Sequence, residues 1–377
     1  MKEFSVSFKD RLKQLDFIII FCALGMNILS LLVLYGASDV WKSGIRFFVV
    51  QSVASLLGIV CMLILAYLDY DAIISKMTIP IFIVSILLMA AVLLFGQDNG
   101  MGNKNWLWIP GLPFSIQPSE FVKITFIITF SRHINRVKDK INDIKNVLAL
   151  LLHAGIIMGL VLLTGDLGST LVFAAIMAVM LFCGGLSMWY FVGAIALVVI
   201  LSPILWNMME EYQRNRIIYG FAPELDPQYA GYQPLLSRSA ISAGGFLGAG
   251  MFGGSVFVNL PQKESDFIFA VICEKFGFIG GALYIILMTV MVIRLIILAR
   301  RARKDYGALI CMGVCALFVA QTLENIGMCL AMLPVVGITL PFCSYGGSSM
   351  LAVYIYLGFV MSISSHNKKY YFERESA

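Results

Sequence analysis

Charged residues are scarce in this sequence of 377 amino acids: 13% are Asp, Glu, Lys or Arg, and three are His. The sequence also has no hydrolase triad motif, no phosphate-binding P-loop, no dinucleotide-binding glycine fingerprint and no zinc-ligand spacing. The eight cysteines include no Cys-x-x-Cys pair and mostly lie in apolar segments, which favours small packing residues over metal ligands or disulfides. These absences argue against the common soluble hydrolases and against nucleotide- or zinc-dependent enzymes.

Apolar residues, in contrast, dominate the chain. They make up 60% of it, and the mean hydropathy is +0.88, which is typical of a protein whose solvent is lipid. About 20 consecutive apolar residues span a bilayer. The sequence therefore predicts an all-α polytopic membrane protein, with about ten spans near 16–36, 44–68, 78–96, 118–132, 146–164, 167–184, 186–206, 267–298, 306–332 and 349–365.

Basic residues cluster on one side of this predicted topology. Cationic side chains flank the cytoplasmic ends of membrane helices, so we expect both termini in the cytoplasm and the first span to be retained. The net charge of +5 is then a topology signal rather than a nucleic-acid footprint. The clusters are Lys2, Lys9, Arg11 and Lys13; Arg132, Arg136, Lys138, Lys140 and Lys145; Arg300, Arg301, Arg303 and Lys304; and Lys368, Lys369 and Arg374.

The long connections fall on the opposite, extracytoplasmic side, at residues 97–120, 207–265 and 333–349. Long loops without a repeating pattern tend to be functional, so the chemistry is expected to face outward. The large loop between the seventh and eighth spans is long enough to fold outside the bilayer. Residues 333–349 combine helix-breaking Pro and Gly with apolar side chains, which predicts a buried re-entrant segment lining a cavity before the tenth span.

Asp266 is the first candidate for chemistry, because it lies where the large polar loop meets the long apolar eighth span. A carboxylate at membrane depth is costly without a partner or a task. Taken alone, the position also suits a helix N-cap, in which Asp accepts the first free backbone N–H groups.

Lys123 is the second candidate. It follows Glu120 by three residues and therefore shares its helix face. The two could form a local ion pair with the lysine snorkelling to the headgroups, or Lys123 could hold a pyrophosphate. Trp106 and Trp108 could be interfacial aromatics or a stacking platform for a sugar or lipid headgroup.

Other polar residues have simpler interpretations. Asp166 is expected to cap the following helix, Glu274 to pair with its neighbour Lys275 or with another helix, and His153 to make an ordinary polar contact. Loop arginines are either solvated or available to phosphate oxygens; these are Arg214, Arg216 and Arg238.

Five segments, in order along the whole chain, resemble the SEDS proteins (shape, elongation, division, sporulation), the RodA/FtsW family. They are NWLWIPGLPFSIQPSEFVK, TGDLGSTLVF, GYQPLLSRSAISAGGFLGAG, LPQKESDFIFAVICEKFG and ENIGMCLAMLPVVGITLPFCSYGGSS. The resemblance implies a single domain over residues 1–377. It also implies a ten-helix peptidoglycan glycosyltransferase that polymerises lipid II, an undecaprenyl-pyrophosphate-linked disaccharide peptide, outside the membrane beside a class B penicillin-binding protein.

The resemblance assigns the family's essential acid to Asp266 and a catalytic role to Lys123. The chain departs from the family pattern at Gly165, Gln262, Glu264-Ser265 and Lys275, which puts affinity and partner choice in doubt more than activity. The ENIGM wording favours a RodA-like elongation role over an FtsW or sporulation role. The expected substrate-binding residues are Trp106, Gln117, Ser119, Glu120, Arg214, Arg216, Arg238, Tyr345 and Ser348.

The expected reaction is attack of an acceptor hydroxyl on a lipid-pyrophosphate-linked glycan, with Asp266 as general base and Lys123 stabilising the leaving pyrophosphate. A loop arginine or a divalent cation, Mg or Mn, could assist, although the sequence offers no dedicated acidic metal cage. Two other functions stay open at this point: a lipid II flippase, or a non-catalytic scaffold for a partner synthase.

Overall fold

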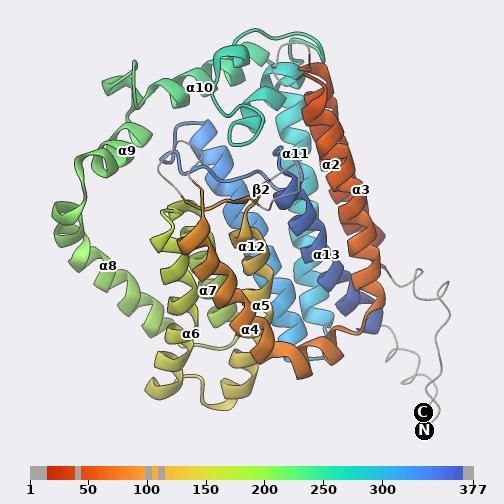
Figure 1. Cartoon of the computed structure of the whole chain (residues 1–377), viewed down its shortest axis with the longest axis vertical. Coiled ribbons are helices and arrows are strands. Elements are labelled where there is room, and N and C mark those ends of the chain that lie inside the picture. The colour runs from red at the N-terminus through yellow and green to blue at the C-terminus, as the bar shows by residue number, and fades with distance from the viewer. Residues whose placement is uncertain (1–14, 39–43, 98–103, 109–114, 368–377) are drawn as a thin grey trace.

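The computed structural model describes residues 15–38, 44–97, 104–108 and 115–367 and shows an almost entirely helical bundle (Figure 1). The long helices are α2 (Phe17–Gly36), α3 (Arg46–Tyr67), α4 (Tyr70–Phe95), α5 (Pro118–Val137), α6 (Ile144–Leu163), α7 (Leu167–Cys183), α8 (Met188–Met208), α11 (Ile268–Arg301), α12 (Asp305–Cys329) and α13 (Gly347–Asn367). The shorter elements are α9 (Glu211–Phe221), α10 (Tyr232–Gly244), the 3-10 turns η1 (Lys138–Lys140), η2 (Pro223–Leu225) and η3 (Phe257–Asn259), and the strands β1 (Leu107–Trp108) and β2 (Ser115–Ile116).

The helices have the composition of membrane spans, as predicted. Among the described residues, seven are long and apolar enough to cross a bilayer, and α7 and α8 contain shorter apolar stretches. α5 is too polar to be counted with them, yet most of its residues are buried because α4, α6, α7 and α12 pack around it. With α5, the helices match the ten predicted spans. The start predicted for the third span, near residue 78, was wrong: α4 begins at Tyr70, where Asp69 caps it.

α12 is the central helix of the bundle. It packs against α5, α7, α10, α11 and α13, while α3 lies along α13 and α2 along α11 (Figure 1). α8, in contrast, stands apart from the bundle and exposes most of its side chains. α9 and α10 fold over one end of the bundle (Figure 1). We call the end that carries residues 209–266 the loop end.

The segment between α12 and α13 is non-helical, and residues 340–344 in its second half are buried, as the sequence predicted for a re-entrant segment. Its backbone is held by side chains from inside the bundle: Ser30 of α2 donates to the Cys343 carbonyl at 2.6 Å, and Gln51 of α3 donates to the Ser344 carbonyl at 3.0 Å. Unpaired backbone groups at membrane depth are costly, so these bonds are what allow the segment to lie there.

Glu274 and Lys275 hold the large loop onto α11. The expectation that Glu274 pairs with Lys275 or with another helix was wrong, because Glu274 bonds the backbone of the loop. The Glu274 carboxylate accepts the N–H groups of three consecutive residues, 255 to 257, at 2.7, 2.8 and 2.7 Å. Lys275 Nζ donates to the carbonyls of Gly36, Met251 and Gly253 at 3.2, 2.9 and 3.1 Å. Both charges are satisfied by backbone dipoles instead of by a counter-ion.

α11 is interrupted at Gly277, whose φ of 63° is in the left-handed region that favours glycine. The break lets residues 244–250 come against the helix, and the Phe278 N–H donates to the Gly245 carbonyl at 2.8 Å. At Gly244 the approach is so close that a Cβ atom would lie 1.9 Å from the Cys273 carbonyl oxygen.

We therefore expect Gly244→Ala to lower the free energy of unfolding by about 1–3 kcal/mol or more, because backbone would have to move. Gly155→Ala is the matched control, since Gly155 lies inside α6 and a Cβ atom added there would meet nothing within 4 Å. The control should be neutral or raise stability by about 0.5–1 kcal/mol. Thermal denaturation in detergent measures both, and equal melting temperatures for the two variants would contradict this packing.

Candidate active site

Asp266 lies in the turn that precedes α11. The N-cap position of that helix belongs to Phe267, which makes no side-chain cap bond. The Asp266 backbone carbonyl accepts a hydrogen bond from Asn325 Nδ2 of α12 at 2.8 Å. Its carboxylate lies against the re-entrant segment, where a Cβ atom placed on Gly337 would be 3.3 Å from Oδ2. The backbone of Asp266 is therefore held by α12, its carboxylate adjoins Gly337, and the N-cap position of α11 belongs to the next residue.

Asp266 also lines a cavity of about 640 Å³ at the loop end. The cavity brings together α9, α10, the 261–266 turn and the re-entrant segment, and its polar lining combines tyrosines, amides and two carboxylates. Amide groups and tyrosine rings together suit a ligand rich in hydroxyl and amide groups, such as a sugar or peptide. This polar lining consists of Asn215, Tyr219, Asp226, Gln228, Tyr229, Tyr232, Gln233, Gln262 and Asp266.

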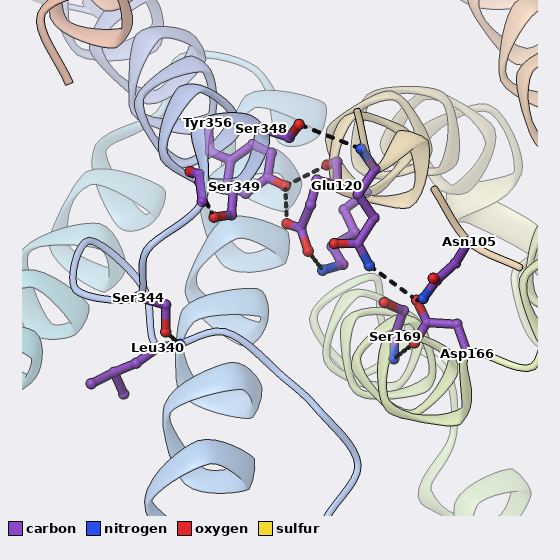
Figure 2. A network of polar contacts seen from close by, with 12 residues as sticks. Asn105, Glu120, Asp166, Ser169, Leu340, Ser344, Ser348, Ser349 and Tyr356 are labelled. Atoms are coloured by element: carbon purple, nitrogen blue, oxygen red, sulfur yellow. Dashed lines mark hydrogen bonds and ion pairs between the residues drawn. The ribbon is translucent and has the colours of Figure 1, made fainter. Parts of the chain in front are cut away.

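Lys123 and Glu120 form a second polar centre, inside the bundle (Figure 2). Lys123 Nζ lies 2.7 Å from Glu120 Oε1, and the two side chains are 0% and 4% exposed, so Lys123 does not snorkel to the surface. Tyr356 of α13 donates to the Glu120 backbone carbonyl and lies 3.4 Å from Glu120 Oε2. The ion pair expected from the sequence is present, but the expected snorkelling was wrong because the pair is buried; contact of Lys123 with a pyrophosphate stays a prediction.

Asp166 connects this centre to the first outer loop. It caps α7 by accepting the Ser169 N–H at 2.9 Å, as predicted. Its other oxygen accepts from Asn105 Nδ2 and Gln117 Nε2, each at 3.3 Å (Figure 2). The Gln117 N–H in turn donates to Ser348 Oγ at 3.4 Å. Residues from four separate segments are thus joined at the loop ends of α5, α7 and α13.

The re-entrant segment separates the two centres. On one side Gly337 adjoins the Asp266 carboxylate, and on the other Gly168 of α7 packs against Val336 and Ile338. Asn325 Nδ2 bridges the Asp266 carbonyl and the Ile338 carbonyl at 2.8 and 2.6 Å. The structure therefore brings the predicted residues together in two groups, with Lys123, Glu120 and Gln117 in one and Asp266 in the other.

The remaining predicted site residues lie around these groups. Trp106 pairs with Gln97 in an antiparallel bridge, and Tyr345 packs its ring 4.4 Å from that of Phe47. Ser119 is buried, and its Oγ has no hydrogen-bond partner within the described part of the chain.

Two of the loop arginines, Arg214 and Arg238, do not line the cavity. Arg238 pairs with Glu224 at 2.7 Å on the surface, and backbone hydrogen bonding together with Arg238 holds the pKa of Glu224 below its ordinary value. Arg214 is half-buried on α9 and is not among the lining residues. The Arg216 side chain lies outside the described part of the structure, so substrate contacts by the arginines stay predictions.

Sequence reasoning missed most of the cavity lining and one acid of the interior. Tyr219 and Asp226 come together only when the large loop folds, which no local pattern indicates. Glu324 was visible in the ENIGM motif as an acid inside an apolar span, and that signal could have found it. His153, taken as an isolated histidine, lies 3.1 Å from His133 and 3.2 Å from Thr129 Oγ1.

Among the described residues no group of three or more His, Cys, Asp or Glu side chains could hold a metal ion. We therefore derive no step through a cation.

Known proteins resemble this chain over nearly its whole length. The family model that covers the FtsW, RodA and SpoVE proteins, described as cell cycle proteins, matches residues 14–369. The chain belongs to this family. The family's probable peptidoglycan glycosyltransferase FtsW of Trichlorobacter lovleyi is 30% identical over 363 residues, which are 94% of each chain.

Three further proteins extend the comparison. The peptidoglycan glycosyltransferase MrdB of Escherichia coli is 37% identical over 295 residues, 76% of this chain and 78% of MrdB. Among solved structures, a chain of a peptidoglycan synthase complex that coordinates polymerization and crosslinking superposes with a TM-score of 0.82 at 27% identity, covering 94% of this chain and 98% of that one. The rod shape determining protein RodA of Thermus thermophilus gives 0.69 at 25% identity, covering 93% and 96%.

The buried pair makes a stability prediction for Lys123→Met, which keeps the length of the side chain and removes its charge. Glu120 would be left as a buried acid without its cation, so the free energy of unfolding should fall by about 3–5 kcal/mol. Glu120→Gln/Lys123→Met is the control, because it removes both charges and should recover most of the loss. Thermal denaturation in detergent distinguishes them, and a single variant as stable as the parent would show that the pair contributes nothing.

Proposed function

We propose that this chain is a peptidoglycan glycosyltransferase that polymerises lipid II into glycan strands on the outer face of the cytoplasmic membrane. Membership of the family and the names of its relatives support the activity. The observation that carries the proposal is Asp266, a carboxylate at the wall of a cavity lined with tyrosines and amides. A sugar hydroxyl placed in that cavity would have a base beside it.

In the proposed reaction, the 4-hydroxyl oxygen of an acceptor N-acetylglucosamine forms a bond to the anomeric carbon of the donor, inverting its configuration. The bond between that carbon and the pyrophosphate oxygen breaks, and the lipid pyrophosphate leaves with the bonding electrons. Asp266 takes the proton of the attacking hydroxyl as general base.

The positions of the two centres suit the two parts of such a donor, its pyrophosphate and its sugars. Lys123 lies five residues after Pro118, the first residue of α5, and is therefore about 7 Å inside the bundle at 1.5 Å per residue. A lipid-linked pyrophosphate sits at the boundary between tail and sugars, so Lys123 would meet the pyrophosphate while the sugars occupy the cavity at Asp266. Glu120 holds the lysine in place until the anionic group arrives.

We also infer an orientation, a partner and a cellular role. The basic residues at the end opposite the loop end support a cytoplasmic location for that end and for both termini. A class B penicillin-binding protein is the proposed partner, which the likeness to a chain of a peptidoglycan synthase complex supports. A RodA-like role in cell elongation and shape is proposed from the ENIGM motif, and the 37% identity with MrdB of Escherichia coli over 295 residues agrees with it.

Asp266→Asn tests the general base, because the amide keeps the shape of the side chain and cannot accept the proton. Purified variant given fluorescent lipid II should form glycan chains about 10²–10⁴-fold more slowly than the parent. Asp305→Asn is the control, since Asp305 forms an exposed ion pair with Lys138 far from the loop end. Near-normal chain synthesis by Asp266→Asn would remove Asp266 from the mechanism. If the parent protein moved lipid II between the two leaflets and formed no glycan chains, a flippase would be favoured.

Cysteine accessibility in intact cells tests the orientation. In a background without the eight native cysteines, a single cysteine at Asp226 should react with an impermeant thiol reagent added from outside. A cysteine at Lys138 should react only after the membrane is permeabilised. The reverse pattern would place the cavity in the cytoplasm and end the proposal.

A further inference from the structure

α12 turns a polar face toward the two centres. Gln321, Glu324 and Asn325 are spaced three and four residues apart and therefore share one side of the helix. Asn325 bonds the Asp266 turn and the re-entrant segment, as described. Glu324 lies five residues before Cys329, the last residue of α12, which is the depth that Lys123 has in the facing helix α5.

Glu324 Oε2 is buried and has no hydrogen-bond partner within the described residues. Two neighbouring polar atoms share this property: Gln321 Oε1, one turn away on α12, and Ser119 Oγ, one turn from Lys123 on α5. The Gln321 and Ser119 residues are 1% and 2% exposed. Buried polar groups in folded proteins are nearly always paired, so two unpaired oxygens one turn apart on α12, those of Gln321 and Glu324, indicate a partner that the described residues do not supply.

The charged groups around Glu324 indicate whether its carboxyl group carries a proton. Lys123 and Asp166 are the charged groups that act on it, and Lys123 Nζ is already bonded to Glu120. Tyr356 from α13 is bonded to Glu120 and leaves no donor for Glu324. If Glu324 were ionised with Glu120 and Asp166, three carboxylates would face one ammonium, and an anion could not approach. Glu324 is half-buried, and its buried oxygen, Oε2, is more stable without a donor when it carries a proton.

We propose that Glu324, in its protonated form, donates a hydrogen bond to a phosphate oxygen of the lipid-linked diphosphate, beside Lys123. This inference rests on the proposed function and names a residue that touches the donor's diphosphate. The hydroxyl of a protonated Glu324 supplies the donor that the site otherwise lacks, and Gln321 and Ser119 complete a polar lining on the two helices. Binding of the diphosphate should therefore weaken as the pH rises and Glu324 loses its proton.

The test measures binding of undecaprenyl diphosphate in detergent micelles, with uncharged undecaprenol as the control ligand. All variants are made on Asp266→Asn, so binding is read without turnover and does not depend on whether the chain polymerises lipid II. Glu324→Leu removes the donor and should weaken diphosphate binding by about ten-fold to a hundred-fold at about pH 6, the range expected for one hydrogen bond to a charged group. Undecaprenol binding should not change.

Glu324→Gln supplies an amide donor that does not titrate. It should bind the diphosphate about ten-fold or more tightly than the Glu324 parent at about pH 9, where a buried glutamate has lost its proton. Glu224→Gln, an exposed acid of the large loop, is the matched control and should follow the parent at every pH. Equal pH dependence of the Glu324→Gln variant and the parent, or undiminished binding by Glu324→Leu, would overturn the inference while leaving the polymerase proposal to its own test.

Discussion

The need to satisfy backbone polar groups inside an apolar bundle governs the architecture around the site. The re-entrant segment has no helical hydrogen bonds of its own, and water is not available at membrane depth to replace them. Ser30, Gln51 and Asn325 from three helices supply donors to its carbonyls, and Tyr284 adds a fourth at the Pro341 carbonyl, 3.3 Å away. Those bonds hold the re-entrant segment, whose residues 336–338 separate Asp266 from Lys123, so both centres depend on them.

Under the proposed function, this separation would let one site hold a substrate with two unlike ends. The cavity at Asp266 is open to the loop end and lined with groups that suit sugars, whereas the interior at Lys123 is enclosed by α5, α7, α12 and α13. The large loop is held in place from below by Glu274 and Lys275, which bond backbone groups of residues 251–257 directly before the Asp266 turn.

Much of this could be predicted from the sequence, because lipid imposes strong and local rules. Apolar runs gave the spans, Asp166 was expected to cap α7, and the Pro and Gly residues of 333–349 indicated a buried non-helical segment. The partners of Glu274 and Lys275 could not be predicted, since both bond to backbone groups that a folded loop brings to them. The same holds for Tyr219 and Asp226, which reach the cavity only through the folding of α9 and η2. The separation of Lys123 from Asp266 by residues 336–338 is likewise a property of packing.

A structure of the protein bound to a non-hydrolysable lipid II analogue would test the account most directly. The account predicts the acceptor-side sugar hydroxyl within about 2.6–3.2 Å of the Asp266 carboxylate, the reach of a general base. It also predicts the diphosphate analogue on the Lys123 side of residues 336–338, in contact with the ammonium. A diphosphate bound at the end opposite the loop end, or sugars outside the cavity that Asp266 lines, would contradict it.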